Sequence, residues 1–71
     1  MKLKANDYEA KDIIKILREW TELSQKEFGE SIFMSSWAIH GYERNKRRFP
    51  VEVLLKIANK HGFAITIESK K

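Results

Sequence analysis

The chain has 71 residues, of which 42% are hydrophobic and 34% are charged, and its formal net charge at pH 7 is +4. This composition excludes a disordered chain, and the length predicts a single domain, residues 1–71, with a small core. No apolar run is long enough to cross a bilayer or to act as a secretion signal, so we expect a cytoplasmic protein with no membrane partner. The lack of cysteine excludes disulfides, thiolate nucleophiles and cysteine metal sites.

The positive charge is concentrated in the second part of the chain. Residues 7–30 carry seven acids and four bases, a charge of −3, whereas residues 31–71 carry three acids and eight bases, a charge of +5. Scattered lysines usually form a solvated face, but a dense basic cluster indicates a surface that binds a polyanion. The densest cluster consists of Arg44, Lys46, Arg47 and Arg48.

The first segment with a helical period lies at about residues 7–21. Asn6 or Asp7 is suited to cap this helix, because a short polar side chain accepts a hydrogen bond from the unpaired N–H groups of the first turn. The preceding residues 1–4 alternate apolar and basic side chains, which is compatible with a short strand or a frayed end. The apolar residues that recur at steps of three and four are Ala10, Ile13, Ile14, Ile16, Leu17 and Trp20.

Two helix-start signals follow, eleven residues apart. Ser24 and Glu27 form a capping box, which predicts a second helix that starts at Ser24. Ser35 is a second capping residue and predicts a third helix at about 35–43. This spacing leaves room only for a tight turn, as in a helix-turn-helix. The apolar residues placed to staple the two helix starts are Leu23 with Phe28 and Met34 with Ile39.

A fourth helix is predicted at about residues 50–61. Pro50 suits the first position of a helix, where the missing N–H is not needed, and Gly62 suits the left-handed position that ends one. The residues expected on its buried face are Val51, Leu54, Leu55, Ile57 and Ala58.

After Gly62 the apolar period changes from helical to alternating. Residues 63–69 therefore predict a C-terminal strand, with Phe63, Ile65 and Ile67 on one face. A lone strand leaves backbone groups unpaired, so this strand needs a partner, either residues 1–4 or a second copy of the chain. We favour the second copy, which would make a homodimer through paired strands.

The stretch LSQKEFGESIFMSSWAIHGYERNKRRFPVEVLLKIA, residues 23–58, resembles the helix-turn-helix of the phage repressor and Cro family, also called the XRE type. The resemblance extends over about residues 13–61 and implies a mainly α fold, a four-helix domain followed here by the C-terminal strand. In such proteins the second helix crosses the phosphate backbone and the third lies in the major groove. The most specific matching residues are Leu23, Ser24, Gln25, Ile39, Tyr42 and Glu43.

The resemblance also implies roles for individual residues. The DNA bases would be contacted by Ser36, Trp37, His40, Gly41 and Arg44. The phosphates would be contacted by Ser24, Gln25, Ser35, Lys46, Arg47 and Arg48. Arg18 of the first helix would form a structural ion pair with Glu43 at the end of the third.

Four positions depart from the family pattern. Phe33 stands where many members have a glycine in a left-handed turn, so the turn is either reshaped or strained. Gly29 replaces an alanine of the second helix, which permits close packing but weakens the helix by about 1 kcal/mol. Ser36 is an ambiguous base reader and Gly41 has no side chain, so direct readout is expected to be thin and to depend largely on Trp37.

These observations lead us to expect a sequence-specific DNA-binding transcriptional regulator, a repressor of bacterial or phage origin, that binds double-stranded DNA as a homodimer. The alternative is the antitoxin of a toxin–antitoxin pair, which would bind a protein toxin as well as its own operator. No recognisable Ser/His/Asp arrangement and no glycine-rich phosphate loop is present, and His40 and His61 are isolated. We therefore expect no enzyme activity, no cofactor and no metal.

Overall fold

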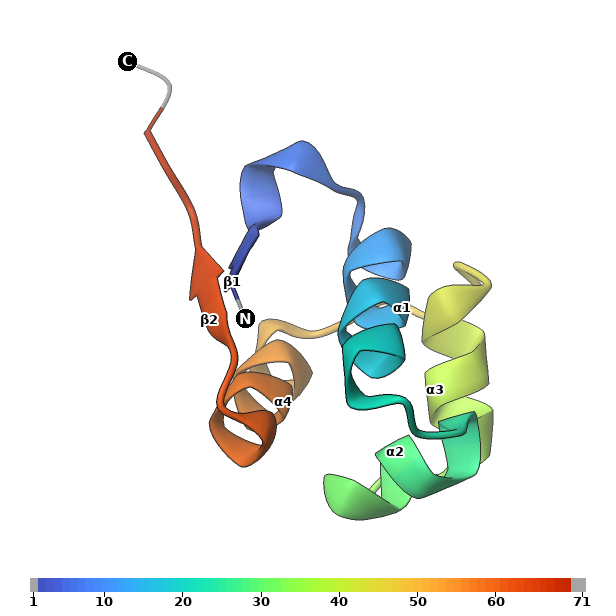
Figure 1. Cartoon of the computed structure of the whole chain (residues 1–71). Helices are drawn as coiled ribbons and strands as arrows, with labels where there is room; N and C mark the ends of the chain where they lie inside the picture. Colours follow the sequence, from blue (N-terminus) through green and yellow to red (C-terminus); the bar gives the residue numbers. More distant parts are fainter. Residues whose placement is uncertain (1, 70–71) are drawn as a thin grey trace.

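The computed structural model describes residues 2–69, and Met1, which we assigned to a possible first strand, lies outside them. The elements in chain order are β1 (Lys2–Lys4), the short 3-10 helix η1 (Ala5–Asp7), α1 (Ala10–Thr21), α2 (Gln25–Ser31), α3 (Ser36–Glu43), α4 (Val51–His61) and β2 (Ala64–Thr66). The predicted fold class, mainly α with four helices and a C-terminal strand, is confirmed. In Figure 1, α3 lies on one side of α1 and the two strands lie on the other. No helix within residues 2–69 combines the length and the apolar character needed to cross a membrane.

The core is formed where the apolar faces of the four helices meet. Ile13, Ile14 and Leu17 of the predicted apolar face of α1 are buried, and Trp20 packs at its margin with its ring 5.4 Å from that of Phe63. Ile16 also lies at the margin, but Ala10, the first residue of the helix, is exposed, which corrects that part of the prediction. The expected face of α4 is partly wrong, because Val51 and Leu55 are 69% and 55% exposed. At 100° per residue these two lie opposite the residues of α4 that are buried. The largest fully buried side chains are Phe28, Ile14, Leu17, Ile39 and Ile57.

The first helix begins three residues later than predicted, and neither proposed cap is used. Tyr8 is extended, and the residue that precedes α1 is Glu9, whose side chain makes no capping bond. The amide of Asn6 instead donates to the backbone oxygen of Glu68 at 2.8 Å and accepts from its N–H at 2.9 Å. Asn6 therefore joins the two ends of the described chain rather than starting a helix.

The C-terminal strand pairs within the chain, which corrects our preference for strand pairing with a second copy. β1 and β2 run parallel, and Leu3, which is 3% exposed, lies opposite Ile65. The strand is also shorter than residues 63–69, since Phe63 precedes it and Ile67 follows it with a side chain that is 78% exposed. Because β1 satisfies one edge of β2, a second copy is not needed for that purpose, and the homodimer stays a prediction.

The two capping residues of the helix-turn-helix act as predicted. Ser24 Oγ accepts from the Glu27 N–H at 3.1 Å and Glu27 Oε1 accepts from the Ser24 N–H at 3.2 Å, which completes the capping box. Ser35 Oγ accepts from the Ala38 N–H at 3.2 Å at the start of α3. A Cβ on Gly29 would lie 2.5 Å from the carbonyl oxygen of Met34, so glycine lets the turn pack closely on α2.

The turn between α2 and α3 carries backbone strain at Phe33. Its φ is 61° and its side chain is 95% exposed, so no packing compensates for the left-handed conformation. We predict that Phe33→Gly raises the free energy of unfolding by roughly 1 kcal/mol, because strain of about 1–2 kcal/mol is relieved and glycine entropy offsets part of it. In a thermal melt this corresponds to a gain of about 4–8 °C. Phe33→Ala is the control, and an equal gain in that variant would contradict strain as the cause.

The ring of His61 connects the end of α4 to α2. It lies 5.5 Å from the ring of Phe28, and Nε2 is 2.9 Å from Oγ of Ser31. Burial, together with the charge of Lys60, lowers the pKa of His61 because both disfavour the protonated ring. The folded state then binds the proton less well than the unfolded state does, so this contribution to stability is present above about pH 6.5 and is lost as pH falls below it.

We therefore predict that the unaltered protein loses stability as pH falls below about 6.5, and that His61→Gln flattens this part of the profile. Urea unfolding at a series of pH values measures the slope for both proteins. Equal slopes in this interval would rule out His61 as its origin.

Candidate nucleic-acid interface

An ion pair between α1 and the end of α3 sets the position of α3. Arg18 Nε donates to Glu43 Oε2 at 2.7 Å and Arg18 Nη2 donates to Oε1 at 3.0 Å. A third donor, Nη1, reaches the carbonyl oxygen of Leu23 at 3.3 Å, just before α2. The side chains are only 20% and 6% exposed, and hydrogen bonding to Glu43 raises the pKa of the Arg18 guanidinium. One arginine thus links α1, α3 and the segment that leads into α2.

The face of α3 that points away from the core is polar and aromatic. Ser36, Trp37 and His40 are exposed, and the Trp37 side chain is 78% exposed. These three residues and Gln25 line a shallow hollow of about 320 Å³ between α2 and α3. The opposite face of α3 is buried through Ala38, Ile39 and Tyr42.

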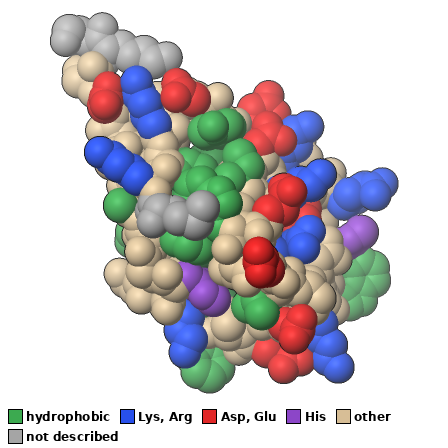
Figure 2. All heavy atoms as spheres, in the orientation of Figure 1, with side chains coloured by type: hydrophobic (Ala, Val, Ile, Leu, Met, Phe, Trp, Pro, Cys, Tyr) green, Lys and Arg blue, Asp and Glu red, His purple; other side chains and the backbone are tan. Residues whose placement is uncertain are grey.

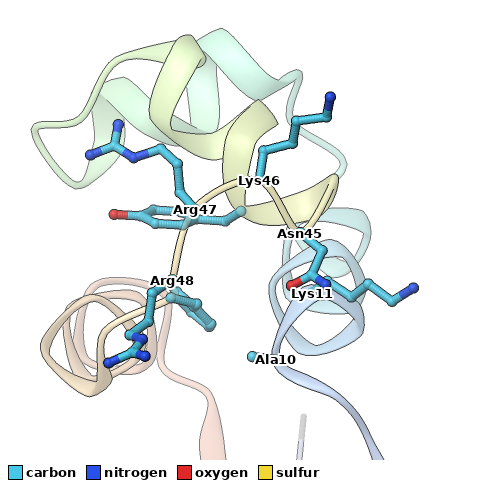
Figure 3. A pocket seen from close by; sticks show the side chains of 8 residues that line it. Ala10, Lys11, Asn45, Lys46, Arg47 and Arg48 are labelled. Carbon is cyan, nitrogen blue, oxygen red and sulfur yellow. The ribbon is translucent and has the colours of Figure 1, made fainter.

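A loop with four basic residues, residues 44–49 and called here the basic loop, follows α3 and folds back on it. Asn45 adopts a φ of 57°, a left-handed conformation that asparagine tolerates better than most residues. The N–H groups of Lys46 and Arg47 then both donate to the carbonyl oxygen of Gly41, at 2.8 and 3.2 Å. Figure 3 shows Lys46, Arg47 and Arg48 pointing in different directions from this loop, with Arg47 turned toward α3 and Arg48 toward α4.

The basic loop also borders a hollow of about 360 Å³ that has no acidic side chain among its lining residues. Acidic side chains lie elsewhere, and Figure 2 shows many of them spread over α1 and α2. The hollow is therefore electropositive and suited to an anion. Its lining residues are Ala10, Lys11, Tyr42, Asn45, Lys46, Arg47, Arg48 and Phe49.

Comparison with known families identifies the class of this domain. A family model described as Helix-turn-helix matches residues 14–66. The chain belongs to the helix-turn-helix family of the phage repressor and Cro type. No curated protein and no solved structure gave a significant match. This is a family of DNA-binding regulators of transcription rather than of enzymes, and the helix-turn-helix protein described here is a DNA-binding regulator in that sense.

Within this helix-turn-helix, the predicted base-contacting residues do not all lie at the surface. Ser36, Trp37 and His40 share the exposed face of α3, and Arg44 is exposed directly after it. Gly41, by contrast, is buried, because the side chain of Arg47 lies across it. Gly41 therefore offers no surface to a base in this structure.

The predicted phosphate contacts fall into two groups. Lys46, Arg47 and Arg48 are exposed on the basic loop, and the exposed Ser24 and Ser35 are the caps of α2 and α3. Both cap oxygens accept backbone bonds, which leaves each O–H proton as a donor. Gln25 differs, because its side chain is partly buried and Nε2 lies 3.4 Å from Glu43 Oε1, a long hydrogen bond.

Lys11 belongs to the electropositive hollow of the helix-turn-helix, although sequence reasoning did not single it out. It lies in the first turn of α1, next to Asn45 in Figure 3. Within residues 2–69, Lys11 forms one ion pair, an exposed contact of 3.8 Å with Glu9, which is too weak to occupy it. Nothing in the sequence separates Lys11 from Lys15, the other lysine of α1, because only the packing of α1 against the loop brings Lys11 here.

Proposed function

We propose that this protein is a sequence-specific transcriptional repressor that inserts α3 into the major groove of double-stranded DNA and acts in the cytoplasm. The observation that carries the proposal is the arrangement of α3 and the basic loop. Their backbones are joined at Gly41 by two hydrogen bonds, which hold the exposed cations of the loop next to the end of α3. A reading helix with phosphate-binding cations beside it matches what this kind of docking needs.

On this surface the roles divide between bases and phosphates. Ser36, Trp37, His40 and Arg44 would face the base edges, with the large exposed ring of Trp37 suited to thymine methyl groups. Lys46 and Arg48, with the hydroxyls of Ser24 and Ser35, would contact phosphates and provide affinity for any sequence. Lys11 would join this phosphate-binding group, whereas Gly41 would have no direct contact.

The proposal includes a homodimer, because two recognition helices related by a two-fold axis could read half-sites about 34 Å apart. Within residues 2–69 the sheet has two strands, so one edge of β2 has no partner strand and is available to a second copy. In Figure 1 the sheet lies on the opposite side of α1 from α3, so pairing there would leave α3 uncovered.

Selection of bound sequences from random double-stranded DNA, combined with a mass measurement in solution, tests these statements together. The proposal expects one enriched sequence with two inverted half-sites about 10 base pairs apart and a protein mass of two chains. Enrichment of a single half-site by a monomer would remove the dimer. An absence of any enriched sequence would contradict sequence-specific binding.

A second candidate function is the antitoxin of a toxin–antitoxin pair, and the exposure of Phe33 favours it. Phe33 borders a largely apolar hollow of about 350 Å³ that also includes Ile32, Lys56 and Lys60. A hollow that is largely apolar and bordered by two lysines is suited to bind a segment of another protein that is both apolar and acidic. Binding of a co-expressed neighbouring gene product that Phe33→Gly abolishes, while DNA binding persists, would support this candidate. Unchanged binding in that variant would exclude this surface.

A further inference from the structure

Gly41 follows the exposed His40 in α3, yet it is buried. A Cβ at this position would lie 2.9 Å from both Cγ and Cδ of Arg47, and 3.6 Å from its Cβ. Any residue with a side chain would therefore push the stem of Arg47 off α3. Because Gly41 has no side chain, α3 cannot contact a base from this position, and the same lack of a side chain allows Arg47 to lie along the helix.

The position of Arg47 is held at several points. Its own N–H donates to the Gly41 carbonyl oxygen at 3.2 Å, and its guanidinium carbon lies 5.6 Å from the centre of the Tyr42 ring. Tyr42 is itself 4% exposed and packs against Phe49 at a ring distance of 5.3 Å. A cation over an aromatic ring gains about 0.5–1 kcal/mol at an exposed site. Together with the backbone hydrogen bond, this contact favours one direction for the Arg47 side chain in the free protein.

The guanidinium of Arg47 keeps its donors available. The ion pairs within residues 2–69 are Lys4 with Glu68, Lys11 with Glu9 and Arg18 with Glu43, so no carboxylate neutralises Arg47. Arg48, its neighbour in sequence, is also exposed but points toward α4 in Figure 3. Two adjacent arginines therefore have different surroundings, and only one of them lies along α3.

We propose that Arg47 is a specificity-determining residue that reads a guanine in place of the missing side chain at Gly41. This inference rests on the proposed function, since it assumes that α3 enters the major groove. A guanidinium presents two parallel donors that match the O6 and N7 acceptors of guanine, and a pair of this kind discriminates between bases by roughly five- to 150-fold. The family resemblance implied that Arg47 contacts a phosphate. A phosphate contact, however, requires neither a side chain that lies across Gly41 nor a guanidinium placed over the Tyr42 ring.

Selection of bound sequences from random DNA tests the inference on the full chain with Arg47→Lys, Gly41→Ala and Arg48→Lys. Arg47→Lys keeps the charge but loses the paired donors, so affinity for unrelated DNA should stay within about twofold while guanine preference at one position per half-site is lost. Gly41→Ala leaves Arg47 in the chain but displaces its stem, so preference at the same position should weaken. Arg48→Lys is the matched comparison at a proposed phosphate contact: any change in affinity should be the same for every sequence, so the preferences between bases should not change.

A measurement without DNA tests whether the side chain of Arg47 lies across Gly41 and beside Tyr42. In the unaltered protein, the side-chain protons of Arg47 should show ring-current shifts from Tyr42 in an NMR spectrum, and these shifts should disappear in Gly41→Ala. Circular dichroism establishes that each variant is folded. If Gly41→Ala does not fold, the result for Arg47→Lys decides the matter.

The outcomes separate the inference from the function on which it rests. If the unaltered protein enriches a sequence and Arg47→Lys keeps every preference with a uniform change in affinity, Arg47 is a phosphate contact and the inference is wrong. If Gly41→Ala is folded and keeps the preference, the claim that Gly41 positions the side chain of Arg47 is wrong. If the unaltered protein enriches no sequence, the proposed function fails and the inference fails with it.

Discussion

Arg18→Ala is expected to lower the free energy of unfolding by about 3 kcal/mol, the largest stability effect that we predict for a single substitution. The reason is that Glu43, only 6% exposed, would keep a carboxylate without its two charged donors. The same change also frees the carbonyl oxygen of Leu23 from its bond to Arg18. For a domain of this size the loss corresponds to a fall of roughly 12 °C or more in a thermal melt.

The double variant Arg18→Met with Glu43→Leu is the matched control for this prediction. An apolar pair of similar volume leaves no buried charge, so we expect it to recover most of the lost stability, as buried ion pairs often do when both partners are replaced. If Arg18→Ala changes stability by less than about 1 kcal/mol, the pair is solvated in solution and does not fix α3.

Lys46→Ala combined with Arg48→Ala is expected to produce the largest loss of DNA binding. Each phosphate contact adds about 0.9 to the slope of log affinity against log salt concentration, which at about 0.1 M salt amounts to roughly eightfold in affinity. Loss of two contacts should therefore weaken binding to every sequence roughly 60-fold and reduce the slope by about 1.8. Titration of labelled duplex DNA at several salt concentrations measures both quantities.

The control for this variant removes the same charge from another face. Lys56 and Lys60 lie on α4 beside Phe33, at a hollow that shares no lining residue with the basic loop. Lys56→Ala with Lys60→Ala should therefore have a much smaller effect on affinity and slope. Equal losses in the two double variants would mean that net charge alone, and not the basic loop, governs binding.

The features that the sequence predicted well depend on residues close together in the chain. Ser24 and Ser35 start their helices because a cap oxygen bonds an N–H three residues ahead. Gly62 ends α4 with a φ of 71° for a similarly local reason. The family resemblance added Arg18 and Glu43, a pair separated by 25 residues that periodicity alone would not have joined.

The features that were mispredicted depend on residues far apart. Asn6 looked like a helix cap, but its amide bonds Glu68, 62 residues away, which no local pattern reveals. The sequence left both residues 1–4 and a second copy as possible partners of the last strand. The parallel pairing of β1 with β2 depends on where the end of α4 lies relative to β1, which is a long-range property. Gly41 was predicted to contact the DNA bases, but in the structure the side chain of Arg47 covers it.

By itself, therefore, the sequence determined that this is a helix-turn-helix domain with a basic loop behind its third helix. Capping, helical period and charge clustering are properties of neighbouring residues, and they can be read directly from the order of the chain. Only the tertiary structure decided which surface that domain presents, because burial of Gly41 and the direction of Arg47 arise when the loop packs back on α3. The same packing placed Lys11 at the basic loop, since contacts between distant segments form only when the helices share one core.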